Sequence, residues 1–446
     1  MSKENNVGVE GIFDAKQLGV PKMLILGVQH MFAMFGATVV VPALTGLDVS
    51  TTLLFAGLGT LLFHFLSKGK VPAFLGSSFA FLAGYWAIAP NGETELLPYA
   101  CFGVACAGLL YLVLAGLIKA FGINKVMRFF PPIVTGPIII AIGLNLSQSA
   151  IDNCAANWWI AVVAIAVVVI CNIWGKGMIK IIPIIMGVVV SYVLAAITGN
   201  VDFTPIKEAA WIGLPIHFEN TVFSVIGKGD TSLLITSVIT IMPIALATMV
   251  EHIGDISAIS STVGKNYIKD PGLHRTLIGD GLATALASLF GAPANTTYGE
   301  NTGVLSLTKV YDPLVIRIAA GFAILFSFSP KIAAVISCMP TATLGGVSLV
   351  LYGMISAVGV RNVVENQVDF SKSRNVIIAA LILVLSIGIN FSAMGAIGFT
   401  IGSVNISLSG LAVGALTGII LNAILPGKDY NFDEEIPSDT VVNFKV

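Results

Sequence analysis

Long apolar runs follow one another along almost the whole chain, and they constrain the fold more than any other feature of the sequence. Fourteen runs approach or exceed the length that crosses a hydrocarbon core. Hydrophobic residues make up 56% of the 446 residues, and charged residues only 11%. A soluble protein of this length exposes far more charge, so the sequence predicts an all-α polytopic membrane protein.

The basic residues indicate how the spans are oriented. If the N-terminus is cytoplasmic, the cytoplasmic loops and ends hold all 23 Lys and Arg residues except Lys207, Lys228 and Lys331. Basic residues stay on the cytoplasmic side, and a miscounted span would scramble this pattern. We therefore predict two cytoplasmic termini and spans at residues 22–46, 50–67, 72–89, 98–121, 126–147, 157–174, 180–199, 231–257, 273–291, 294–309, 313–329, 332–358, 375–391 and 405–426.

The two halves of the chain resemble each other. Gln29-His30 in the first span matches Glu251-His252 in the eighth. The spacing to the next matching motif is also similar, because Gln29 lies 49 residues before Ser78 and Glu251 lies 46 residues before Thr297. In the third and tenth spans, 72-PA-73 with 77-SSFA-80 matches 293-PA-294 with 296-TTYG-299. Because each half holds seven spans, an odd number, the second copy is predicted to be inverted, as in many secondary transporters.

The predicted organisation follows from this repeat. A surface-lying amphipathic loop separates the repeats outside the cell, and the polar tail is predicted to be disordered. The parts are a cytoplasmic N-terminal segment (1–21), the first repeat (22–199), the extracytoplasmic loop (200–230), the second repeat (231–427) and an acidic cytoplasmic tail (428–446).

Residues 291–309, GAPANTTYGENTGVLSLTK, are polar although they lie between two apolar runs of spanning length. An ionised carboxylate at mid-membrane costs roughly 2.5–3.5 kcal/mol even on lenient insertion scales, so Glu300 is not expected to face lipid. Pro and Gly beside small hydroxyl residues predict backbone that leaves the regular helix. Such backbone is tolerated at membrane depth only against protein or a water-filled cavity, and transporters use broken spans to hold polar solutes.

Glu251 lies deep in the predicted eighth span and is the second acid of the predicted site. In an inverted repeat the third and tenth spans approach each other at mid-membrane, with the first and eighth beside them. The alternative is that each acid is a buried group satisfied by neighbouring hydroxyls, or lies at a membrane interface. The cost of intramembrane acids favours a site. Its predicted lining is Glu251, Glu300, the backbone around Phe79 and Gly299, and the rings of Phe79 and Tyr298.

These groups suit a flat, polar, uncharged ring such as uracil. Ionised carboxylates accept hydrogen bonds from ring N–H groups, and backbone N–H groups at helix ends match exocyclic carbonyls. Aromatic side chains add apolar contact. Two carboxylates in a low-dielectric pocket also disfavour simultaneous ionisation, so one can take up a proton and couple transport to H⁺. No other cofactor is predicted.

Other polar residues carry weaker predictions. His252 is as suited to bridging helices as to relaying protons. Asp255 lies one helical turn after Glu251, so it either joins a proton path or marks the cytoplasmic end of the eighth span. Tyr352, near a predicted span end, is more typical of packing than of ligand binding. The residues predicted to bridge helices or support the site are Gln29, His30, Ser78 and Asn301.

Several function classes are disfavoured. The net charge of −1 excludes the basic face that nucleic-acid binding needs. No GxxxxGK[ST], GxSxG or HExxH motif supports ATP-driven transport or an intramembrane hydrolase, so we predict no enzyme activity. The open alternatives are a carrier of the same fold for another nucleobase (xanthine, urate or thymine) or for an anion, and a channel. Two acids argue against an anion site, and broken spans favour alternating access over a channel.

The sequence resembles the nucleobase–cation symporters of the nucleobase–ascorbate transporter family, most closely its bacterial uracil carriers. The similarity runs across nearly the whole chain. Glu300-Asn301-x-Gly303-x4-Thr308 fits the family signature, whose first residue is Glu in uracil-type members. The matching stretches are QHMFAMFGATVVVP (29–42), KVPAFLGSSFAF (70–81), EHIG (251–254), KDPGLHR (269–275), NTTYGENTGVLSLTKVY (295–311) and GGVSLVLYG (345–353).

The resemblance implies a core domain of spans 1–4 and 8–11 and a gate domain of spans 5–7 and 12–14. Short extended segments of spans 3 and 10 would meet at the site. It further implies uracil–proton symport across a bacterial inner membrane by elevator movement of the core, and a homodimer formed through the gate domains within membrane lipid. Some uracil-type members carry His where this chain has Asp255. The implied substrate-binding residues are Glu251, Glu300, Phe79, Gly299, Tyr298 and Tyr352, and the implied proton-coupling residues are Glu300, Glu251 and Asp255.

Overall fold

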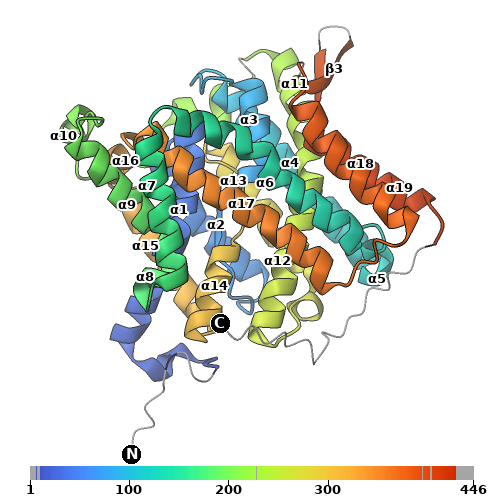
Figure 1. Cartoon of the computed structure of the whole chain (residues 1–446), viewed down its shortest axis with the longest axis horizontal. Helices are drawn as coiled ribbons and strands as arrows, with labels where there is room; N and C mark the ends of the chain where they lie inside the picture. Colours follow the sequence, from blue (N-terminus) through green and yellow to red (C-terminus); the bar gives the residue numbers. More distant parts are fainter. Residues whose placement is uncertain (1–6, 8–10, 228, 394, 402–403, 428–446) are drawn as a thin grey trace, which may run out of the picture.

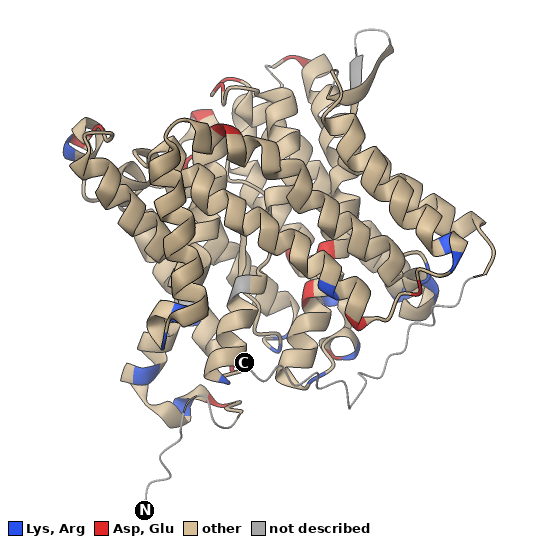
Figure 2. Cartoon of the chain, in the orientation of Figure 1, with Lys and Arg blue, Asp and Glu red and all other residues tan. Residues whose placement is uncertain are grey.

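A computed structural model describes residue 7 and residues 11–227, 229–393, 395–401 and 404–427 of the chain. The predicted acidic tail and most of the first ten residues lie outside this part. The described residues are mainly helical, and most helices run across the molecule between its upper and lower ends (Figure 1). Lys and Arg gather mainly toward the lower part of the molecule (Figure 2).

The elements of the first half are η1 (Ala15–Leu18), α1 (Val20–Thr45), α2 (Val49–Leu66), β1 (Leu75–Ser77), η2 (Phe79–Phe81), α3 (Leu82–Ile88), α4 (Leu97–Phe121), α5 (Ile123–Met127), α6 (Pro132–Ala155), α7 (Trp158–Trp174), α8 (Met178–Ile181) and α9 (Pro183–Ile197). The connection to the second half carries α10 (Thr204–Glu208), η3 (Phe218–Asn220) and η4 (Val222–Ser224).

The elements of the second half are α11 (Thr231–Ile241), η5 (Met242–Ile244), α12 (Ala245–Val263), η6 (Ile268–Gly272), α13 (Leu273–Leu289), β2 (Asn295–Thr297), α14 (Gly299–Thr308), α15 (Pro313–Ser327), α16 (Pro330–Ser337), α17 (Thr341–Glu365), α18 (Ser373–Asn390), β3 (Ala396–Ile401), β4 (Val404–Ser409) and α19 (Gly410–Ile424).

Seven helices among the described residues are long and apolar enough to cross a membrane, or eight if the pair α15 and α16, bent by 87°, counts as one span. Residues 231–263 pass as one long helix in this count. Shorter apolar helices cover residues 79–88, α7, α9 and α19. The chain is therefore a multi-pass helical membrane protein, and the number fourteen stays a prediction.

Several predicted boundaries are wrong, and in three cases a proline breaks the helix. The span expected at 126–147 is helix α6, which starts at Pro132 after a break from α5 and runs to Ala155. The span expected at 332–358 is divided before Thr341, since Pro340 cannot continue α16. The eighth span is interrupted around Pro243 and continues to Val263. Residues 405–409, expected to be helical, form part of strand β4, and α19 starts at Gly410.

The helices pack in pairs that match between the two halves. Helix α2 packs on α15 while α13 packs on α4, and α7 packs on α17 while α18 packs on α6. Likewise α7 packs on α9 and α18 packs on α19, and the pair α6 and α17 joins the halves. Exchanging the halves maps the contacts of one half onto those of the other and the α6–α17 pair onto itself, which is the pattern expected of an internal repeat.

Two short strands meet in the middle of this arrangement, as the sequence predicted for the third and tenth spans. Strands β1 and β2 are antiparallel, with Gly76 opposite Thr296 at the centre. The ladder is extended at each end by one hydrogen bond, from the Ser78 N–H to the Ala294 carbonyl (2.8 Å) and from the Tyr298 N–H to the Phe74 carbonyl (3.0 Å). We call residues 74–79 and 294–299 the crossing.

The crossing corrects the sequence alignment of the two halves. A local two-fold axis through the central pair relates its two outer hydrogen bonds. Under this axis Ser78 of the first half corresponds to Tyr298 of the second, and Phe79 corresponds to Gly299. The sequence motifs paired Ser78 with Thr297, one residue away. Matching hydroxyl side chains suggested that register, whereas the backbone pairing sets the real one.

Gly76 allows the two strands to approach at the centre of the crossing. A Cβ atom there would lie 2.5 Å from Tyr298 Cζ and 2.6 Å from Thr38 Oγ1, both buried. We expect Gly76→Ala to lower the free energy of unfolding by about 1–3 kcal/mol, the usual cost of overpacking. Denaturant unfolding of the purified protein in detergent measures this. Gly303→Ala is the control, because a Cβ at Gly303 meets nothing within 4 Å; equal losses in both variants would contradict the prediction.

Candidate functional site

Glu251 and Asp255 lie one turn apart on α12, which packs beside β2 and α14. Thr297, the last residue of β2, donates a hydrogen bond from Oγ1 to Asp255 Oδ2 at 2.7 Å. Both acids are half-buried. Because α12 continues to Val263, Asp255 lies within the helix and not at its C-terminal end. The face of α12 that carries the two acids is thereby held against the crossing.

Helix α14 starts at the crossing. Gly299 is its first residue and is exposed, and a Cβ atom there would meet nothing within 4 Å. The backbone of Glu300 lies in the first turn of α14, and its side chain is outside the described part of the structure. The start of a helix presents free backbone N–H groups and favours negative charge. This end of α14 can therefore bind a carbonyl or an anion.

The aromatic residues of the predicted site have different surroundings. The rings of Phe79 and Tyr352 meet edge to face, with centroids 5.6 Å apart and planes at 76°, so the crossing touches α17 here. The Tyr298 hydroxyl donates to the Ser77 carbonyl at 2.9 Å and accepts from Thr38 Oγ1 at 3.3 Å. Tyr298 thus ties the crossing together with its side chain, whereas Phe79 and Tyr352 form an aromatic pair beside it.

The supporting residues link α1 to α14. Asn301 Nδ2 donates to the His30 carbonyl at 3.1 Å and lies 3.1 Å from His30 Nδ1, with both residues buried. Ser78 is also buried, and its N–H extends the ladder of the crossing. Gln29, next to His30, is half-buried and faces a pocket described below. The His30–Asn301 contact fixes the first span beside the start of α14.

Asp280 on α13 belongs to the same region, although it is not among the residues predicted from the sequence. His252 Nδ1 lies 3.1 Å from Asp280 Oδ2, and both side chains are completely buried. Thr297 Oγ1 is 3.5 Å from the same His252 nitrogen, so Thr297 stands between this pair and Asp255. An acid inside the predicted ninth span was the available signal, since intramembrane acids are expensive.

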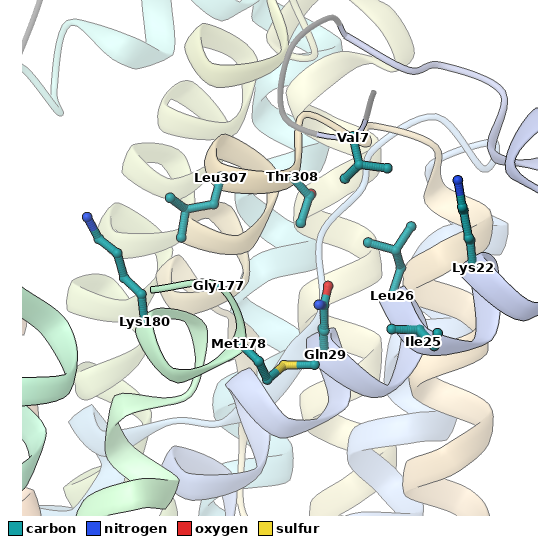
Figure 3. Close-up of a pocket in the computed structure, with 10 residues that line it drawn as sticks. All are labelled: Val7, Lys22, Ile25, Leu26, Gln29, Gly177, Met178, Lys180, Leu307 and Thr308. Carbon is teal, nitrogen blue, oxygen red and sulfur yellow. The ribbon is translucent and has the colours of Figure 1, made fainter. Parts of the chain in front are cut away.

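A pocket of about 410 Å³ lies between α1, the C-terminal end of α14 and the segment around α8 (Figure 3). Among the predicted site residues, Gln29 is in its lining. Apolar side chains form most of the wall, with Lys22 and Lys180 on different sides of it (Figure 3). The lining residues are Val7, Lys22, Ile25, Leu26, Gln29, Gly177, Met178, Lys180, Leu307 and Thr308.

Paired broken spans with acids and helix ends at their crossing define a class of membrane transporter, and solved structures share this fold. The transmembrane domain of a cyanobacterium bicarbonate transporter, BicA, aligns with a TM-score of 0.54 and 15% identity, covering 80% of this chain and 98% of that one. The overall structure of SLC26A9 aligns with a TM-score of 0.65 and 13% identity, covering 92% of this chain and 66% of that one. At these identities the likeness concerns the fold.

The sequence comparison identifies the family. The Xan_ur_permease profile, described as a permease family, matches residues 21–395, and the chain belongs to this family. It is 41% identical over 436 residues to the uracil permease of Bacillus caldolyticus, covering 95% of this chain and 97% of the relative. It is 38% identical over 413 residues to the uracil permease of Escherichia coli (strain K12), covering 90% of each. The resemblance recognised from the motifs is confirmed.

Proposed function

We propose that this protein imports uracil together with protons across a bacterial inner membrane. The observation that carries the proposal is the crossing, where the start of α14, the Phe79–Tyr352 ring pair and the acid-bearing face of α12 come together. The names of relatives that are 38–41% identical over nearly the whole chain support uracil as the substrate.

Each edge of uracil has a matching group in this arrangement. Glu251 and Glu300 accept hydrogen bonds from the ring N–H groups. The backbone N–H groups at Phe79 and Gly299, where helical structure begins, donate to the ring carbonyls. The Phe79 ring, which packs edge to face on Tyr352, adds apolar contact beside the base. Tyr298 has a positioning role in this proposal, since its hydroxyl bonds to Ser77 and Thr38.

Proton coupling follows from the acids of α12 and α14. Uptake of one proton with a neutral base gains about 2.3 kcal/mol per 100 mV, which is roughly fifty-fold accumulation. Glu251, Glu300 and Asp255 are the proposed coupling groups. In this chain the carboxylate of Asp255 takes the place of the His found in some family members, and Thr297 holds it at the crossing.

The proposed architecture has fourteen spans in two inverted repeats. Spans 1–4 and 8–11 form a core that moves as an elevator, and spans 5–7 and 12–14 form a gate domain through which two copies dimerise. The matched packing supports this division, because α6, α7, α9, α17, α18 and α19 pack largely on one another. The crossing belongs to the core, and Tyr352 on α17 contacts it from the gate.

A wider pyrimidine range is the second candidate function. The putative pyrimidine permease RutG of Escherichia coli (strain K12) is 38% identical over 426 residues, covering 93% of this chain and 91% of the relative. Thymine differs from uracil by one methyl group, and a single methylene changes recognition by only about 1–3 kcal/mol. Competition by unlabelled thymine against labelled uracil separates the two candidates.

Radiolabelled uracil uptake into proteoliposomes tests the proposal. We expect an inward proton gradient to drive accumulation above the external concentration, and a protonophore to abolish it. Glu300→Gln is expected to lose this accumulation, because the amide cannot exchange a proton. Facilitated entry without accumulation in the wild type would contradict proton coupling. Transport of xanthine with no transport of uracil would overturn the substrate.

A further inference from the structure

Two connections occupy matching places in the two halves of the chain. Residues 175–182, which include α8, join α7 to α9, and we call them the inner flap. Strands β3 and β4 join α18 to α19, and we call them the outer hairpin. In the proposed inverted repeat, α7 matches α18 and α9 matches α19. The flap and the hairpin are therefore counterparts at opposite ends of the molecule.

The outer hairpin packs against α11, the helix that begins the second half of the protein. Strand β4 packs along α11, and α11 also contacts α3. Figure 1 shows the hairpin beside α11 at the upper end of the molecule. Helix α11 is the first part of the long helix that starts the second half, and α3 follows the strand β1. At this end the hairpin, α11 and α3 form one packed group.

The inner flap touches α1 through α8, but it packs on α1 much less extensively than β4 packs on α11. The counterparts of α11 and α3 are the first part of α1 and helix α14. The 410 Å³ pocket lies between these two helices and the flap (Figure 3). In Figure 3 the Met178 side chain of the flap extends toward Gln29 of α1, and Ile25 of α1 and Leu307 of α14 line other parts of the wall. At the outer end β4 packs closely on α11. At the inner end the pocket lies between the corresponding elements, the flap and α1.

The flap and the pocket walls are suited to closure. Gly177 has a φ of +57°, which favours glycine, and a Cβ atom there would meet nothing within 4 Å, so the flap has open space beside it. Helix α8 has only four residues. Ile25 and Leu307 are 55% and 44% exposed in the pocket wall. Movement of the flap toward α1 would bury these apolar side chains and gain hydrophobic free energy.

We propose that the pocket is the open cytoplasmic half of the substrate pathway and that the inner flap is its gate. In the opposite state the flap packs on α1, as β4 packs on α11 here, and the outer hairpin separates from α11. The structure is then the inward-open state, with Gln29 on the release route. This inference rests on the proposed transport function.

Cross-linking of cysteine pairs tests the gate. In the first variant, Ile25→Cys with Met178→Cys, a short bifunctional thiol reagent joins α1 to the flap. In the matched control, Phe35→Cys with Phe326→Cys, the same reagent joins α1 to α15, two parts of the proposed core that meet outside the pocket. A third set pairs Leu408→Cys on β4 in turn with Leu233→Cys, Leu234→Cys and Ser237→Cys on α11. The parent chain, treated alike, corrects for its five free cysteines.

We expect the α1–flap link to reduce uracil uptake at least about tenfold, because one half of the cycle is blocked, while the control link keeps more than about half of it. A hairpin–α11 link is expected to block uptake as well. Equal uptake with the α1–flap and control links would overturn the proposal. So would normal uptake with the hairpin joined to α11.

A second readout needs no substrate. Leu307→Cys is labelled with a membrane-impermeant maleimide from the cytoplasmic side. We expect this cysteine to remain reactive when the hairpin is linked to α11. In the variant that carries Ile25→Cys, Met178→Cys and Leu307→Cys, we expect the α1–flap link to protect it from the maleimide. If the labelling responds in this way but uracil is not transported, the substrate proposal fails and the gate remains. If the labelling is the same in both linked forms, the gate proposal fails.

Discussion

Glu251→Gln is expected to abolish proton-driven uracil accumulation while the protein remains folded. Glu251 shares a face of α12 with Asp255, which Thr297 holds against the crossing. Replacing the carboxylate by an amide removes a charge-assisted hydrogen bond to a ring N–H, worth about 1.5–3 kcal/mol, and this corresponds to roughly 10–150-fold in affinity. The amide also cannot carry a proton. Initial uptake rates and equilibrium uracil binding on the same preparation measure the two effects.

Glu365→Gln is the matched control for this variant. Glu365 is a surface acid at the end of α17 and pairs with Arg361, with both side chains about half exposed. Exposed ion pairs contribute little, so this variant is expected to transport like the wild type. Glu251→Asp keeps the charge but shortens the side chain, and it should retain proton coupling with weaker binding. Wild-type binding by Glu251→Gln would place the substrate away from α12.

The broken spans could be predicted from the sequence because their chemistry is local. Pro, Gly and hydroxyl residues around Thr297, with an acid nearby, are incompatible with a lipid-facing helix, and the structure has a strand there. The pairing of β1 with β2 also agrees with the repeated motifs. The exact register could not be predicted, because Ser78 and Thr297 are alike as side chains and the ladder instead matches Ser78 with Tyr298.

Other features depend on contacts between distant segments. The sequence predicted that Tyr298 binds the substrate. In the structure its hydroxyl hydrogen-bonds to Ser77 and Thr38, which come close to it only in the folded chain. Strand β4 overlaps the start of the span predicted at 405–426, because its composition suits a span as well as a strand. Its pairing with β3 makes it a strand. The pocket is formed by α1, α14 and the flap, so no single stretch of sequence indicates it.

Asp280 shows how an acid that was not singled out in the sequence can lie in a completely buried pair. Its carboxylate lies 3.1 Å from His252 Nδ1 in a completely buried pair, and the ring of Phe63 lies against His252 with a centroid distance of 6.3 Å. Removing one partner leaves the other buried without its counterpart. We expect Asp280→Leu to lower the free energy of unfolding by about 1–3 kcal/mol, the cost of leaving a buried polar group without its partner, measured by denaturant unfolding in detergent.

A double variant separates the loss of the pair from the loss of packing. His252→Phe with Asp280→Leu replaces both polar partners by apolar groups, and such replacements are often neutral, so we expect most of the lost stability to return. Transport should not return with it, because Thr297 would lose the His252 nitrogen 3.5 Å away while still bonding to Asp255. A stable double variant with wild-type uptake would make the pair purely structural. Wild-type stability of Asp280→Leu would contradict the buried pair itself.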